Sequence, residues 1–191
     1  MKRFLFIKSV DDMTDIQSEL DALFTSLVHV THINHDAHSI LYIYEGEYEL
    51  NFEEVILNML SDTLYDLTLY QSYQFEHIDN LMLHFEFIKE NIELVPKKNG
   101  PYINNQKILK AIIHLPKQLL RDNFMRKYSK DNMMLDTLKS YFENDQNMSK
   151  AAKELYIHRN TLIQRLDKFM QETGFDVRKF QDAVLIYQLI P

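Results

Sequence analysis

The stretch SKAAKELYIHRNTLIQRL, residues 149–166, places two adjacent alanines on one short predicted helix and then restarts with a basic, amide-rich turn. Ala151, Ala152 and Leu155 share a helical face, and alanines there let a second helix approach closely. Asn147 is a suitable N-cap for this first helix. A second helix is predicted after the turn, with these apolar side chains pointing inward: Leu162, Leu166, Phe169 and Met170.

The outward face of that second helix carries side chains suited to nucleic acid. Arginine can pair with guanine, asparagine and glutamine pair with adenine, and threonine and lysine contact bases or backbone. A short helix, a tight turn and a second helix with a polar N-terminal half form a helix-turn-helix, whose second helix enters the major groove. We therefore predict base contacts from Asn160, Thr161, Gln164 and Arg165, and phosphate contacts from Arg159, Lys168 and Lys150.

The same region resembles a known protein family. Residues 134–175 read MLDTLKSYFENDQNMSKAAKELYIHRNTLIQRLDKFMQETGF, which resembles the C-terminal helix-turn-helix of the PucR/CdaR family of bacterial transcriptional regulators. The sequence departs from that pattern at Ile163 and Gln164, usually basic or aromatic in the family, and this bears on base preference. The resemblance covers roughly the last 60 residues and rests on Thr137, Leu138, Tyr141, Ala151, Ala152, Leu155, His158, Arg159, Asn160, Thr161, Arg165, Leu166, Thr173 and Gly174.

The first part of the chain alternates between strand and helix patterns. Four strands are predicted at residues 4–8, 28–33, 39–44 and 67–73, and two amphipathic helices at 13–27 and 52–64. The order β-α-β-β-α-β is that of the ferredoxin-like fold, an antiparallel sheet with both helices on one face. We expect an α+β N-terminal domain followed by an all-α helix-turn-helix domain.

Many PucR/CdaR relatives place a degenerate GGDEF-like domain before the DNA-binding tail. The segment 39–94 looks like a shortened, acidic version of such a domain. It contains no GGDEF signature and no glycine-rich phosphate loop, so nucleotide cyclisation is not expected.

Charge is distributed unevenly along the chain, whose net charge is −7. Residues 1–100 carry 6 lysines and arginines against 18 acidic residues, whereas residues 101–191 carry 15 against 10. This asymmetry favours an acidic module joined to one that meets polyanions, and chance clustering on solvated faces is the alternative.

The glycine and proline of KKNGPYINN, residues 97–105, mark a break. We predict an acidic α/β domain at 1–96, a basic helical connector at 97–130 and a helix-turn-helix domain at 131–191.

Several classes of protein do not fit the composition. The chain has no cysteine, which excludes disulfides and thiolate sites and fits a reducing cytosol. The apolar run 4–7 is too short for a signal peptide, and no stretch approaches the ~20 apolar residues that a membrane span requires. We therefore expect a cytoplasmic protein. Since no Ser/His/Asp order or phosphate-cradling loop can be assembled, we expect neither an enzyme nor a cofactor.

Four histidines recur at every third position in HVTHINHDAH; they are His29, His32, His35 and His38. Imidazole is a common metal ligand, but this spacing alternates between the faces of a strand. We favour solvated turn histidines, with a metal site or a pH sensor as the alternatives.

The last predicted helix, residues 180–190, is apolar nearly all round. It is either part of a subunit interface or packed onto the connector. A homodimer would suit DNA binding, because a two-fold protein reads two half-sites about one helical turn apart.

The sequence as a whole predicts a sequence-specific, DNA-binding transcriptional regulator. The alternative is a protein-interaction module that keeps the helix-turn-helix fold without binding DNA. A small-molecule effector, bound between the α/β sheet and the connector, is compatible with the first prediction.

Overall fold

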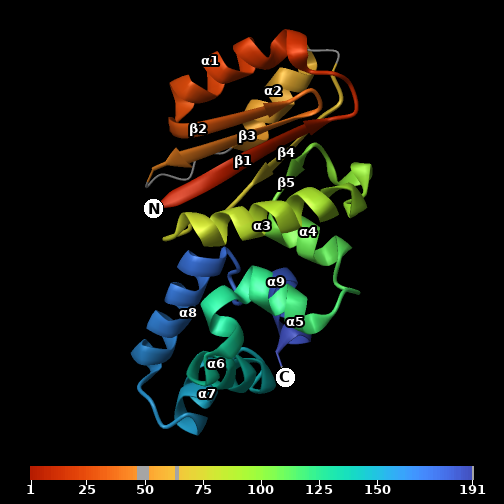
Figure 1. Ribbon diagram of the computed structural model, residues 1–191. Helices are drawn as coiled ribbons and strands as arrows, with labels where there is room; N and C mark the ends of the chain where they lie inside the picture. Colours follow the sequence, from red (N-terminus) through yellow and green to blue (C-terminus); the bar gives the residue numbers. More distant parts are fainter. Residues whose placement is uncertain (47–51, 63–64, 191) are drawn as a thin grey trace. The chain divides into compact units, whose positions relative to one another are not determined.

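The computed structural model describes residues 1–46, 52–62 and 65–190, and its chain forms two compact units, Met1–Ile108 and Leu109–Pro191 (Figure 1). The N-terminal unit is a mixed α and β structure, and the C-terminal unit is helical. Leu64, the last position of the second predicted helix, lies outside the described residues. Within those residues, no helix is long and apolar enough to cross a membrane.

The N-terminal unit is built on a sheet whose five described strands lie in the order β2-β3-β1-β4-β5. β1 pairs antiparallel with both β3 and β4, and β2 forms an antiparallel hairpin with β3. Each of the four predicted strands is confirmed. β5 was not predicted, and it pairs parallel with β4. The strands are β1 (Lys2–Ser9), β2 (His29–Asp36), β3 (Ser39–Glu45), β4 (Leu67–Gln71) and β5 (Tyr102–Ile103).

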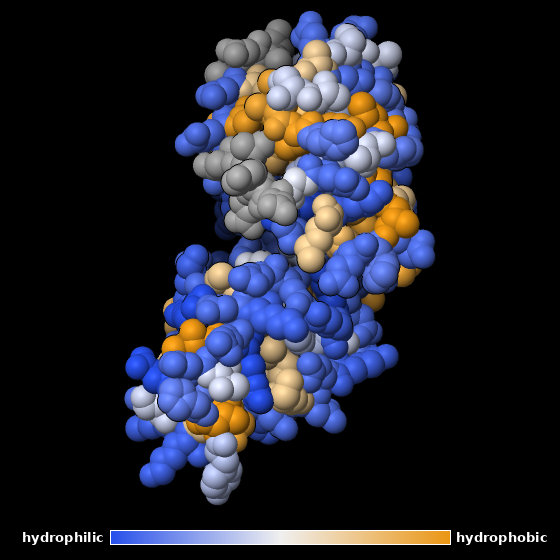
Figure 2. All heavy atoms as spheres, turned by 90° about the vertical axis from the view of Figure 1, so that its left-hand side faces the viewer, coloured by the Kyte–Doolittle hydropathy of each residue, from blue (hydrophilic) through white to orange (hydrophobic). Residues whose placement is uncertain are grey.

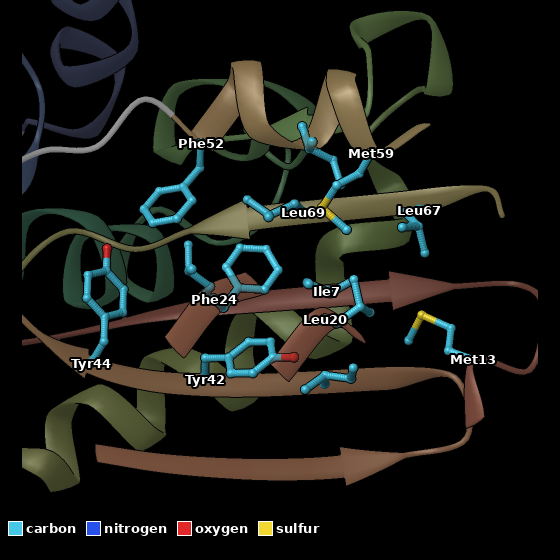
Figure 3. Close-up of a cluster of buried hydrophobic side chains, with 13 residues drawn as sticks. Ile7, Met13, Leu20, Phe24, Tyr42, Tyr44, Phe52, Met59, Leu67 and Leu69 are labelled. Atoms are coloured by element: carbon cyan, nitrogen blue, oxygen red, sulfur yellow. The ribbon is translucent and has the colours of Figure 1, made fainter. Parts of the chain in front are cut away.

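Helices cover both faces of this sheet. α1 (Gln17–Leu27) and α2 (Phe52–Asp62) pack on one face, where their apolar side chains meet those of β1, β3 and β4 (Figure 3). α3 (Ile78–Asn91) covers the other face. Because side chains alternate along a strand, Leu5 and Ile7 of β1 enter the first core, while Phe4 and Phe6 turn toward Phe85 of α3.

Short helical segments follow the sheet and lead into the C-terminal unit. Phe124 and Tyr128 are buried there, with ring contacts to Phe175 and Phe169. Residues 109–130 therefore belong to the same compact unit as the helix-turn-helix region. The remaining segments are 3-10 turns at Thr14–Ile16, Ile92–Leu94, Lys97–Asn99 and Arg126–Lys130, a π-helical turn at Arg121–Met125, and helices α4 (Asn105–Ala111), α5 (Lys117–Leu120), α6 (Asn132–Glu143), α7 (Met148–Glu154), α8 (Arg159–Thr173) and α9 (Phe180–Leu189).

Candidate nucleic-acid interface

Capping residues fix ends of α6, α7 and α8, and the predicted site lies on α7 and α8. Asp131 Oδ1 accepts a hydrogen bond from the Met134 N–H at 3.1 Å and starts α6. Asn147 Oδ1 accepts from two backbone N–H groups of α7, each at 3.1 Å. Gly174, at φ 78°, ends α8 in the left-handed conformation that glycine adopts without steric cost. The predicted N-cap at Asn147 is confirmed.

The two alanines lie where α7 packs against its neighbours. Ala151 and Ala152 are buried, and the Ser140 Oγ of α6 lies 3.4 Å from the Ala151 carbonyl oxygen. From α8, the buried side chains Leu162 and Leu166 complete this core. The small side chains of α7 allow close helix packing, as the sequence predicted. The close packing of α6 and α7 against α8 therefore holds the exposed face of α8 in a fixed position.

The turn between α7 and α8 is held by backbone hydrogen bonds and by a histidine cap. The Ile157 N–H donates to the Ala152 carbonyl at 3.0 Å, and the Tyr156 N–H donates to the Lys153 carbonyl at 3.2 Å. His158 Nδ1 accepts from the Asn160 N–H at 3.2 Å and caps α8. Sequence reasoning missed this role, because Ser, Thr, Asp and Asn are the usual N-caps.

The structure exposes most of the predicted site. Asn160, Gln164 and Lys168 follow one another at four-residue intervals, so they line one exposed face of α8. Arg159 is exposed at the first position of α8, and Lys150 is exposed in the first turn of α7.

Two predicted base-reading residues are only partly exposed. Thr161 is half-buried. Arg165 is also half-buried, and its Nη1 donates to the Thr137 Oγ1 of α6 at 2.9 Å. The Arg165 side chain therefore ties α8 to α6 as well as reaching toward the surface.

The first turns of α7 and α8 carry positive charge where helices ordinarily favour negative charge. Neither turn contains an acidic residue, whereas the first turn of α2 contains Glu53 and Glu54. Because a helix N-terminus is the positive end of its dipole, Lys150 and Arg159 are unfavourably placed unless an anion binds there. Within residues 1–46, 52–62 and 65–190, neither cation forms an ion pair. Figure 2 shows the side of the C-terminal unit on which α8 lies, and hydrophilic side chains prevail there.

The basic segment before α6 uses its charges differently. Arg121 Nε donates to the Leu189 carbonyl at the end of α9, and Arg126 Nη1 donates to the Glu172 carbonyl near the end of α8 at 3.2 Å. Lys127 forms an ion pair with the Glu172 carboxylate at 2.5 Å. Cations at helix C-termini stabilise the helix dipole. These three side chains therefore serve the fold of the unit.

The histidines of the hairpin lie exposed on β2 and its turn. His35 Nε2 lies 3.0 Å from the Asp21 carboxylate of α1, which also accepts a hydrogen bond from the Tyr42 hydroxyl at 2.8 Å. Burial raises the pKa of Tyr42, and the hydrogen bond from its hydroxyl to the Asp21 carboxylate raises this pKa further. Among the residues that the structure describes, no group of three His, Asp or Glu side chains comes together as a metal site.

Comparison with known families agrees with the geometry of this region. Residues 134–188 match the PucR C-terminal helix-turn-helix domain. This segment is a PucR-type helix-turn-helix domain. The match includes all but the first two residues of α6, all of α7 and α8, and most of α9. It confirms the family resemblance of the sequence.

Two relatives of the PucR-type domain have names that describe regulators. The carbohydrate diacid regulator of Escherichia coli (strain K12) is 35% identical over 57 residues, which are 30% of this chain and 15% of that protein. The purine catabolism regulatory protein of Bacillus subtilis (strain 168) is 48% identical over 48 residues, 25% of this chain and 9% of that protein. The chain thus matches a small share of these curated relatives.

One solved structure is similar over more of the chain. It is the regulator of polyketide synthase expression from Bifidobacterium adolescentis, with a TM-score of 0.44 and 16% identity. The similarity covers 98% of this chain and 78% of that one.

Proposed function

We propose that this protein is a cytoplasmic, non-enzymatic regulator that binds specific DNA sequences by placing α8 in the major groove. The observation that carries the proposal is the exposed start of α8, where polar and basic side chains gather without an acidic neighbour in the first turn. Capped and closely packed helices hold that start in place. Such a surface offers hydrogen bonds to base edges and positive charge to phosphates.

The exposure of Asn160 and Gln164 supports their proposed roles. Asn160 and Gln164 present amides that can pair with adenine, and Thr161 supplies a smaller contact beside them. Arg165 has five N–H donors, so the bond to Thr137 leaves others for a base. The phosphate contacts in this proposal are Arg159, Lys150 and Lys168.

We assign the N-terminal unit a sensing or assembly role. The order β2-β3-β1-β4 with antiparallel neighbours, and α1 and α2 on one face, supports a ferredoxin-like arrangement of the kind expected for a degenerate GGDEF-like domain. In this proposal residues 1–96 receive a small-molecule effector or a partner, 97–130 connect, and 131–191 bind DNA.

The protein acts as a homodimer in this proposal, with α9 at the interface. Phe180, Val184 and Tyr187 form an exposed apolar stripe on α9, and the Phe180 side chain is 76% exposed. The stripe borders a hollow of about 440 Å³ that Phe142 and Ala183 also line. In the proposed dimer, the α9 helix of a second copy runs antiparallel to the first and crosses it at Val184, so that each Phe180 ring lies over the hollow of the other copy.

This interface is tested with Val184→Glu, which should convert dimers to monomers in sedimentation equilibrium. An unchanged mass would contradict the α9 interface.

DNA binding is tested with the full chain. Genomic fragments that the protein retains identify a binding sequence, and fluorescence anisotropy then gives the affinity between about 50 and 300 mM salt. The proposal predicts a steep loss of affinity as salt rises, because phosphate contacts release counterions. A protein-interaction module would bind no DNA at any salt concentration.

Sequence reading is tested with the amides of α8. Asn160→Ala should lower affinity for the selected sequence by about 1–3 kcal/mol and leave binding to unrelated DNA nearly unchanged. Gln171→Ala is the matched control, since Gln171 is an exposed amide in the C-terminal half of the same helix. Equal affinities of the Asn160 variant and the parent would refute base reading by this residue.

A further inference from the structure

Tyr156 has an unusual position in the turn between α7 and α8. Its φ is 53°, in the left-handed region, and its side chain is 97% exposed. The two backbone hydrogen bonds of this turn, from Ile157 to Ala152 and from Tyr156 to Lys153, define a Schellman motif that has Tyr156 at the left-handed position. Glycine is the usual residue there, because a side chain crowds the backbone.

Three other non-glycine residues of the C-terminal unit have positive φ, and each differs from Tyr156. Arg126 and Gln146 direct their side chains to backbone carbonyls, of Glu172 at 3.2 Å and of Val177 at 2.7 Å. Asp145 belongs to a residue type that tolerates this conformation. Within the described part of the chain, the Tyr156 side chain makes no hydrogen bond and no ring contact.

The fold therefore gains nothing visible from this tyrosine. A strained backbone position carries a large aromatic side chain that buries almost no surface and has no hydrogen-bond partner among the residues that the structure describes. Backbone strain of this kind clusters at functional positions in proteins. Tyr156 lies two residues before His158, the cap of α8, so its hydroxyl projects from the same turn that presents Arg159 and Asn160.

We propose that Tyr156 is a DNA-positioning residue whose hydroxyl donates a hydrogen bond to a backbone phosphate beside the groove that α8 enters. This inference rests on the proposed function. Tyrosine hydroxyls commonly contact phosphates, and such contacts fix the register of a protein on the duplex without reading sequence. The contact would be neutral, so it differs in kind from those of Lys150 and Arg159.

The test uses the full chain with Tyr156→Phe and Tyr156→Gly, measured on the selected DNA and on unrelated DNA. Tyr156→Phe should weaken binding to both about two- to tenfold, with the melting temperature unchanged. The dependence of affinity on salt should also stay unchanged, since no charge is removed. Tyr156→Gly should bind at least as weakly as Tyr156→Phe and melt at the same or a higher temperature, because glycine relieves the strain.

Tyr65→Phe is the matched control, since it removes a hydroxyl from a partly exposed tyrosine of the N-terminal unit. It should bind DNA like the parent. If Tyr156→Phe also binds like the parent, the phosphate contact is refuted, even where Tyr156→Gly is weaker. A parent protein that binds no DNA refutes the proposed function itself, whereas a binding parent with unaffected Tyr156 variants refutes only this inference.

Discussion

Two groups of cations in the C-terminal unit look alike in the sequence and differ in the structure. Arg121 and Arg126 donate to carbonyls at or near the ends of α9 and α8, where positive charge stabilises the helix dipole. Lys150 and Arg159 stand in the first turns of α7 and α8, where positive charge destabilises it. The comparison teaches that a basic segment is not in itself a nucleic-acid site. Cations that meet the C-terminal end of a helix serve the fold, whereas cations at the N-terminal end are available to an external anion.

The largest effect is expected from two charge-matched double variants. Lys150→Ala with Arg159→Ala should weaken DNA binding by about 2–3 kcal/mol and lower the salt slope by about 2, because the two phosphate contacts that we propose for these side chains are lost. Its free energy of unfolding should be unchanged or slightly increased. Anisotropy titrations over salt and urea unfolding measure the two quantities.

Arg121→Ala with Arg126→Ala removes the same amount of charge from the same unit. This variant should lose about 1–3 kcal/mol of unfolding free energy and keep the salt slope of the parent. If both double variants reduce the salt slope equally, the distinction between the two groups of cations is wrong, and general electrostatic attraction accounts for binding.

Arg165 combines a contact within the fold with a proposed contact to DNA, so it sharpens the comparison. Arg165→Ala should lose about 1 kcal/mol of unfolding free energy, because the bond to Thr137 disappears, and a further 1–2 kcal/mol of DNA affinity if the guanidinium also meets a base. Thr137→Val is the matched control, since it removes the hydroxyl that Arg165 Nη1 contacts and leaves the arginine in place. A stable Arg165→Ala variant with parental DNA affinity would exclude both roles.

The sequence predicted much of the helix-turn-helix region because its signals are local. Asn147 and Gly174 are strong cap residues, and the periodic apolar side chains of α8 point inward as expected. The partners of the basic residues could not be predicted, because Arg121 meets Leu189 across 68 residues of sequence. β5 was missed because a strand of two residues, Tyr102–Ile103, has no periodicity of its own.

The candidate site shows the same division between local and distant signals. Exposure of Asn160 and Gln164 follows from the helical spacing, whereas the bond between Arg165 and Thr137 depends on how α8 crosses α6. Tyr156 was overlooked because its backbone angle, rather than its residue type, makes it unusual.

The smallest effect is expected at Arg178, a cation that serves the fold by contacting acidic side chains. Arg178 contacts the carboxylates of Asp176 and Asp167 at 2.6 and 2.7 Å in and beside the turn between α8 and α9. Burial acts to raise the pKa of Asp176, but hydrogen bonds from Arg178 outweigh it and hold this pKa below its usual value. A carboxyl with a lowered pKa in the folded state stabilises the protein above the unfolded value, and that stability is lost as pH falls through the folded value.

Arg178→Ala should therefore reduce the free energy of unfolding by about 0.5–1 kcal/mol at pH 6. The difference from the parent should shrink as pH falls below the usual aspartate pKa of about 3.9 and through the lowered pKa of Asp176, where the carboxyl becomes protonated in both proteins. Lys139→Ala, an exposed cation on α6, should show no such pH-dependent difference. Urea unfolding from pH 6 to pH 3 measures these changes. Because Arg178 is occupied by acids of its own unit, its loss should leave the salt slope of DNA binding unaltered, and a reduced slope would move Arg178 into the group that faces DNA.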